Sequence, residues 1–168
     1  RLLIPEPAVA ERIQRLEPHL LNTPSIALEQ VIMVIRQMTV ESWDMVRTAT
    51  EQMFFPARHD PELERRLAER ENGVDRLQGE AIDYLVQLST RRLTEPQAEI
   101  IPLLIHCVND AERVADHAEN IISLAERYSQ AKHHFIPEAE TDLRELWRLL
   151  GQQAEHVIAG LQRTDQQE

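Results

Sequence analysis

The segment of residues 100–125 constrains the fold most, because its apolar residues recur at alternating steps of four and three. This spacing places one row of side chains on a single face of an α-helix, and the row consists of Ile100, Leu104, Cys107, Ala111, Val114, Ala118, Ile121 and Ala125. A second row widens the apolar surface and consists of Ile101, Val108, Ala115 and Ile122. Because so wide a surface exceeds a single narrow stripe, we expect this helix to be covered on more than one side.

The composition favours helix and argues against some functions. Only four glycines occur in 168 residues, whereas Leu, Ala, Glu, Arg and Gln are abundant, and these residues favour helix. The net charge of −11 argues against nucleic acid as a partner, because phosphate contacts need an excess of Lys and Arg. The single cysteine, Cys107, is expected to pack as a small hydrophobe. The apolar run at 100–105 is too short to span a membrane, so we expect a soluble domain.

Capping residues next to prolines mark the starts of three long helices, and Pro137 alone marks the start of a fourth. Ser, Thr and Asp cap helices well, and proline suits the first helical turn. We expect the helices to run to about residues 55, 90, 128 and 162, from starts at Thr23-Pro24, Asp60-Pro61, the capping box Thr94-Glu95-Pro96-Gln97, and Pro137. Pro56 is expected to end the first helix, and Pro102 is expected to kink the third.

The other three helices also carry apolar stripes at helical spacing. The stripes comprise Ile26, Val31, Val34, Ile35, Met38, Met45 and Val46; then Leu63, Leu67, Val74, Leu77, Ala81, Leu85 and Leu88; and then Leu143, Leu146, Trp147, Leu150, Val157, Ile158 and Leu161. Gly73 and Gly79 interrupt the second stripe, and each costs about 1 kcal/mol relative to alanine. We expect both glycines to serve close packing, and we expect Trp147 to belong to the core.

These patterns predict an all-α fold, an elongated antiparallel bundle of four long helices. At ~1.5 Å per residue, helices of this length would be about 45–50 Å long. Residues 1–23 are interpreted as a leader or linker with a short helix at 8–17, and residues 24–165 as the bundle.

Residues 109–122 read N-D-A-E-R-V-A-D-H-A-E-N-I-I and resemble the N-D-L-E-R-I-G-D-H-A-E-N-I signature of PhoU-type helical domains. The resemblance implies a spectrin-like three-helix repeat, here with an extra helix. Three positions depart from the signature, namely Ala111, Val114 and Ala115, and Ala115 adds a methyl group where the family has glycine. The phrase at 16–30 further resembles the entry segment of the soluble C-terminal domain of bacterial sodium/phosphate cotransporter-related proteins.

Two carboxylate pairs share the same spacing on consecutive helices: Glu71 with Asp75, and Glu112 with Asp116. Residues four apart lie one above the other on a helix, so each pair occupies one face, and antiparallel packing would bring the four together. Carboxylate oxygens suit hard cations. In the PhoU family such E-x-x-x-D motifs bind metal, so the resemblance implies a metal site of these four residues for a divalent or trivalent cation (Fe, Mn, Zn, Mg or Ca).

Other interpretations of the same residues stay open. An E-x-x-x-D pattern on a helix is common and is usually a solvated face, and Arg76 and Arg113 are close enough in sequence to neutralise the carboxylates. His117 points about 100° away from Asp116 and is expected at the surface rather than as a ligand. An enzyme is not expected, because no His follows a Glu by three residues as in di-iron bundles and no phosphate-binding loop is present.

The resemblance implies a cytoplasmic regulatory domain at the inner membrane that modulates phosphate uptake by a sodium/phosphate cotransporter-type protein. The expected partner is the membrane portion of the same or a neighbouring protein, and homodimerisation is left open. The alternatives are a free PhoU-like metal-binding regulator of phosphate signalling and a purely structural helical adaptor.

Overall fold

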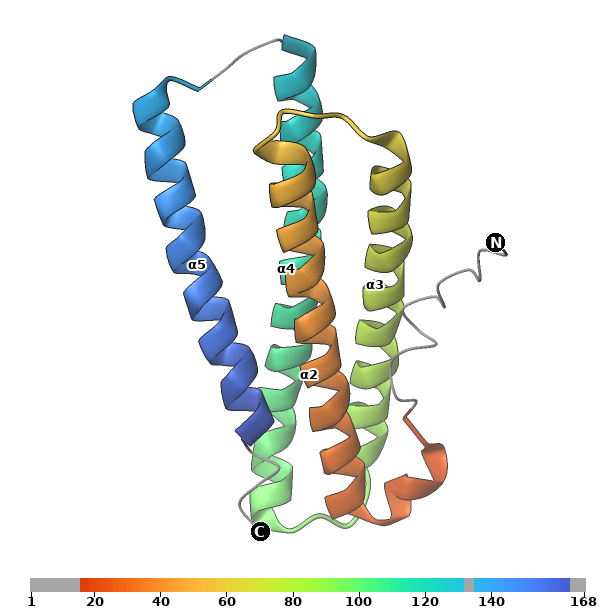
Figure 1. The fold of residues 1–168 in the computed structure, drawn as a ribbon. Coiled ribbons are helices and arrows are strands. Elements are labelled where there is room, and N and C mark those ends of the chain that lie inside the picture. Colours follow the sequence, from red (N-terminus) through yellow and green to blue (C-terminus); the bar gives the residue numbers. More distant parts are fainter. Residues whose placement is uncertain (1–15, 132–134, 164–168) are drawn as a thin grey trace, which may run out of the picture.

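The computed structural model describes residues 16–131 and 135–163, and this part of the chain contains helices and no strand (Figure 1). A short 3₁₀ helix, η1 (Pro18–Asn22), precedes α2 (Pro24–Ala49), which continues into a π-helical segment, η2 (Thr50–Phe54). Three further long helices follow, α3 (Pro61–Ser89), α4 (Glu95–Ala131) and α5 (Pro137–Arg163). The prediction of an all-α fold with four long helices is confirmed, whereas the short helix expected at 8–17 lies almost wholly outside the described residues.

Two of the expected helix starts show the expected hydrogen bonds. The Asp60 carboxylate accepts a hydrogen bond from the Leu63 amide at 3.1 Å, and the Gln97 side chain accepts one from the Thr94 amide at 3.0 Å. The prediction of a side-chain cap at Thr23 is wrong, because its side chain makes no capping hydrogen bond. Thr23 instead ends η1, where its N–H donates to the Leu20 carbonyl at 2.8 Å.

The end of α2 differs in detail from the expected plain stop at Pro56. The Phe55 amide donates to the Thr50 carbonyl at 3.0 Å, five residues back, which widens the turn into a π-helix. In an α-helical turn the ring of Pro56 would clash with the carbonyl four residues before it, and a wider turn relieves that clash. Ala57, with a φ of 49°, then turns the chain out of the helix.

The core lies where α2, α3 and α4 meet, and each of these helices contributes a row of buried residues. The buried residues of α4 are Ile101, Leu104, Val108, Ala111, Ala115, Ala118, Ile122 and Ala125. This row takes members from both predicted rows, and the remaining predicted residues (Ile100, Cys107, Val114 and Ile121) are only partly buried along its edges. α2 and α3 both pack against α4, so the most deeply buried row of α4 lies along the line between these two helices. The expectation that α4 is covered on more than one side is confirmed.

Every residue of the predicted α3 stripe is buried, and so is the predicted α2 stripe apart from its first member. Ile26 is 43% exposed, and the first turn of α2 buries Ala27 and Leu28 in its place. Gly73 is buried, but Gly79 is exposed and a methyl group added there would meet nothing within 4 Å. The expectation of close packing at Gly79 is therefore wrong.

The fourth long helix, α5, packs beside the three-helix core rather than within it (Figure 1). None of its residues between 137 and 161 is buried. Within its predicted stripe, Leu146 is 62% exposed, Leu150 49% and Val157 57%, and Trp147 is half-buried at the edge of the core. The stripe correctly predicted an apolar face of α5, but that face stays partly exposed instead of being buried against the bundle. Within the described residues, no helix is long and apolar enough to cross a membrane.

The substitution Gly79→Ala should raise the free energy of unfolding by about 1 kcal/mol, because alanine favours helix and the added methyl group meets no neighbour. The melting temperature should rise by roughly 2–4 °C for a domain of this size, as measured by circular dichroism. Gly73→Ala is the matched control, since its methyl group must fit among buried side chains. An equal gain at both positions would contradict this account.

Candidate carboxylate site between α3 and α4

The structure places the four predicted site carboxylates on the facing sides of α3 and α4. Glu71 and Asp75 lie on α3, and Glu112 and Asp116 lie on α4. Glu71, Glu112 and Asp116 are half-buried, whereas Asp75 is exposed. The two helices pack directly against each other, so the carboxylates of one influence those of the other across the helix interface.

The Glu71 side chain shows this influence most clearly. Burial raises the pKa of Glu71, and the negative charges of Glu119, Asp75, Asp116 and Glu112 raise it further. Three of these four charges belong to α4, the opposite helix. The contribution of Glu119 extends the cluster beyond the four predicted residues, and its position seven residues after Glu112 puts it on the same helix face.

The Glu112 side chain is perturbed in the same direction. Burial raises the pKa of Glu112, and the charges of Asp116 and Asp75 and a side-chain hydrogen bond with Asp116 add to the rise, against a lowering effect of Arg113. A hydrogen bond between two carboxyl groups needs one proton between them. The site therefore favours retaining a proton or gaining a cation.

A neutral side chain from α3 holds Glu112 in place. The Gln78 amide donates to Oδ1 of Asn109 at 3.1 Å and to Oε2 of Glu112 at 3.3 Å. These bonds cross from α3 to α4 and leave the charge of the carboxylate unneutralised. Sequence reasoning missed Gln78 and Asn109, because an amide pair between helices has no periodic signal.

Positive charge is scarce around the cluster. Arg113 forms its ion pair with Asp110 at 3.9 Å, and both side chains are about three-quarters exposed. Arg113 is close to the site carboxylates in sequence, but its ion-pair partner, Asp110, lies outside the site. Within the described residues, no ion pair joins an arginine to any of the four carboxylates.

The fit to a metal ion is incomplete as the side chains stand. The described residues contain no group of three or more His, Cys, Asp or Glu side chains arranged to hold one ion. Ligation by Glu71, Asp75, Glu112 and Asp116 would require their side chains to rotate toward a common point. Their oxygen-only chemistry suits a hard cation, so metal binding stays a prediction.

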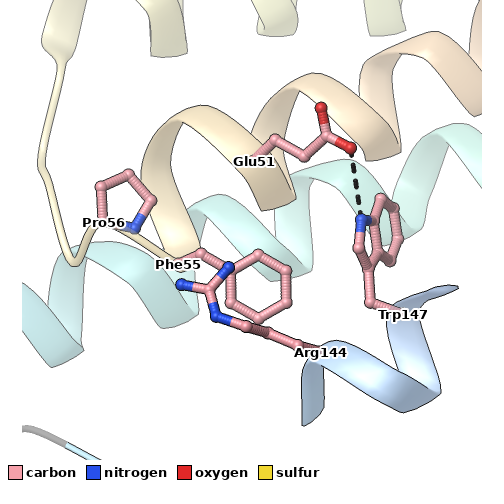
Figure 2. A pocket seen from close by; sticks show the side chains of 5 residues that line it. All are labelled: Glu51, Phe55, Pro56, Arg144 and Trp147. Atoms are coloured by element: carbon pink, nitrogen blue, oxygen red, sulfur yellow. Dashed lines mark hydrogen bonds between the residues drawn. The ribbon is translucent and has the colours of Figure 1, made fainter. Parts of the chain in front are cut away.

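A second feature lies at the other side of α4, where aromatic residues join α5 to the end of α2. The rings of Trp43 and Trp147 stack with centroids 5.2 Å apart, and Phe55 meets Trp147 edge-on at 6.5 Å. Figure 2 shows the pocket beside them, where Glu51 accepts a hydrogen bond from Nε1 of Trp147 at 3.3 Å and the Arg144 guanidinium lies 4.5 Å from the centre of the Phe55 ring. The sequence indicated an apolar Trp147 but not its partners.

The substitutions Glu71→Gln and Glu112→Gln should stabilise the fold at neutral pH. Because the pKa of each is raised in the folded state above the ordinary value of 4.5, the unfolded chain loses these protons first. The stability they provide is therefore present at low pH and is lost as the pH rises above 4.5 through the folded pKa. In urea unfolding measured across a pH series, the free energy of unfolding should decline less steeply with rising pH in the double variant than in the wild type.

Asp44 provides a control of opposite sign. Burial raises the pKa of Asp44, but hydrogen bonds and charges from Arg70 and Arg47 outweigh it and lower the pKa overall. Asp44→Asn should therefore destabilise the fold at neutral pH, with an effect that fades as the pH falls through the folded pKa. Equal pH slopes in the wild type and the Glu71/Glu112 double variant would contradict the proposed crowding.

Comparison with known protein families matches residues 35–125 to the PhoU domain. This match covers α2 from Ile35 onward, α3 and most of α4, which together form the core and carry all four site carboxylates. The searches of curated proteins and of solved structures gave no match.

Proposed function

The chain belongs to the PhoU domain family, and we propose that it regulates phosphate uptake from the cytoplasmic side of the inner membrane. Membership of this regulatory, non-enzymatic family indicates a role in phosphate homeostasis. The proposed partner is a sodium/phosphate cotransporter-type membrane protein, either as part of the same protein or as a neighbour. The family match over residues 35–125 is the observation that supports the regulatory role. The resemblance of residues 16–30 to a cotransporter entry segment supports the cotransporter-type protein as the partner.

The contacts of that entry segment support a mechanical link to the bundle. The Glu17 amide donates to the Gln30 side chain at 3.1 Å, and the Tyr84 hydroxyl donates to the Glu17 carbonyl at 3.1 Å. Leu21 is buried against the core. Because α2 and α3 both contact this segment, a membrane partner that moved the segment would shift both helices.

The second part of the proposal is that the carboxylate site binds a divalent or trivalent cation. The negative charges of neighbouring carboxylates raise the pKa values of Glu71 and Glu112 in addition to burial, and this supports the proposal because a bound cation would relieve the repulsion among these charges. An all-oxygen donor set favours Mg, Ca, Mn or Fe over Zn. Glu71, Asp75, Glu112 and Asp116 would hold the ion, which would supply positive charge between α3 and α4.

Metal-stripped protein titrated with Mn²⁺ should bind the ion and melt at a higher temperature, because the ion binds the folded state preferentially. Asp75→Asn with Asp116→Asn should abolish both effects in calorimetry and thermal melting. Asp83→Asn with Asp110→Asn is the matched control, since it removes two exposed charges from the same two helices. A Mn²⁺ response that survives in the site variant and disappears in the control would exclude this site.

The regulatory role is tested separately, in cells that take up radiolabelled inorganic phosphate. Replacing Glu71, Asp75, Glu112 and Asp116 by their amides in the full-length gene product should change the rate of uptake without changing the amount of protein. Unchanged uptake, with the variant present at normal levels, would favour the purely structural adaptor. A gene product that regulates phosphate-responsive expression without binding a transporter would favour the free regulator.

A further inference from the structure

A large groove lies between α2, α4 and α5, on the side of α4 away from the carboxylate site. Its volume is 740 Å³, which is within the range of small-molecule sites. Three helices form its walls, with Thr39 and Trp43 on α2, Val114 and Ile121 on α4, and Val157 on α5 among the lining residues. The groove is thus formed by tertiary packing and not by one exposed helix face.

The walls of the groove carry no formal charge. Among the described residues that line it, none is Asp, Glu, Lys or Arg, although such residues make up 28% of the chain. Leu146, Leu150 and Val157 of α5 and Leu124 of α4 line it and remain between 46% and 62% exposed. An ionic ligand such as phosphate would find no counter-charge there, so electrostatic complementarity selects an uncharged, apolar occupant.

Aromatic side chains hold the groove open. The stacked rings of Trp43 and Trp147 bridge α2 and α5, and Phe55 braces Trp147 from the side. Two indoles placed one on the other occupy the space between the helices, so α5 cannot settle onto α2 at that level while the stack persists. At the outer edge of these rings, Glu51 accepts a hydrogen bond from Trp147 and the Arg144 guanidinium lies over the Phe55 ring (Figure 2). The groove is therefore preformed.

Hydrogen-bonding capacity in the groove is confined to few side chains. The hydroxyls of Thr39 and Thr50 already donate to the carbonyls of Ile35 and Val46, each at 2.8 Å. Within the described part of the chain, no hydrogen bond engages the side chains of His117 or Gln153. His117 on α4 and Gln153 on α5 therefore offer polar groups from two walls of a largely apolar groove, whereas the side-chain NH₂ of Asn120, the third such lining residue, already donates to the Asp116 carbonyl.

We propose that this groove binds a neutral small amphiphile, with a hydrocarbon body along α2, α4 and α5 and one hydroxyl-type end at His117 and Gln153. This inference does not depend on the phosphate-related function. A second copy of the chain is the less suitable occupant, because each copy carries a net charge of −11 and like charge opposes association.

The test uses 1-dodecanol as the ligand and the neutral dye N-phenyl-1-naphthylamine as the reporter. The dye should fluoresce on binding the wild-type protein, and dodecanol should displace it, whereas inorganic phosphate should not. Both tryptophans of the chain line the groove, so dodecanol should also change the intrinsic fluorescence.

Three variants decide whether the groove is the binding site. Val157→Lys places a charge in the groove and should weaken dodecanol binding at least about tenfold, because burying an unpaired charge is unfavourable. Leu149→Lys makes the same kind of change on the same helix at a 45% exposed position that does not line the groove, and it should leave binding unchanged. Ala154→Trp should fill the groove and reduce binding, although it adds apolar surface.

Circular dichroism first establishes that each variant keeps its helices, and Leu149→Lys and Ala154→Trp remain informative if Val157→Lys unfolds. Dye binding that rises in Ala154→Trp, or that falls equally in both lysine variants, would overturn the proposal in favour of unspecific apolar contact. Sedimentation showing a dimer that Val157→Lys dissociates, with no dodecanol binding to the monomer, would overturn it in favour of a second copy. Loss of binding in Val157→Lys and Ala154→Trp alone would support it.

Discussion

The packing of α4 between α2 and α3 is the constraint on which the rest of the structure depends. Its buried row follows steps of three and four from Ile101 to Ala125, and four of the eight members are alanines. Small side chains let helices approach closely, and a seven-residue repeat keeps one seam facing its partners along the helix. Ala115 is 1% exposed, so the methyl group that distinguishes this chain from the glycine of the PhoU signature fits within the core.

This packing explains why the crowded carboxylates are tolerated. A like-charge pair four residues apart costs only a few tenths of a kcal/mol on an exposed helix, and half-burial and the opposing helix increase that cost at Glu71 and Glu112. Fully burying a single valine or leucine contributes about 1.5–3 kcal/mol, and α3 and α4 bury many such residues beside the site. Apolar burial therefore decides the helix positions, and the raised pKa values of Glu71 and Glu112 reflect the crowding of carboxylates that results.

Sequence predicted those parts of the fold that depend on local chemistry and periodicity. Prolines and the Asp60 cap located the helices, and the stripe of α3 located its buried face in full. Periodicity does not show which neighbouring helix covers an apolar face, so the sequence did not predict that α5 lies outside the core. The i, i+4 spacing placed the carboxylates on one face, but Gln78 and the stacking partner Trp43 are long-range contacts without periodic signal. Glu119 could have been included, because it follows Glu112 by two helical turns.

The geometry of α4 also explains why a charged site and a neutral groove can lie on one helix. Glu112 and Asp116 face α3, the alanine row faces the core, and Val114 and Ile121 face the groove. Successive residues turn by about 100°, so His117 lines the groove although it directly follows Asp116. The buried alanine row separates the carboxylates from the groove along the whole shared length. Each surface can therefore keep its own charge and chemistry, although both belong to one continuous helix.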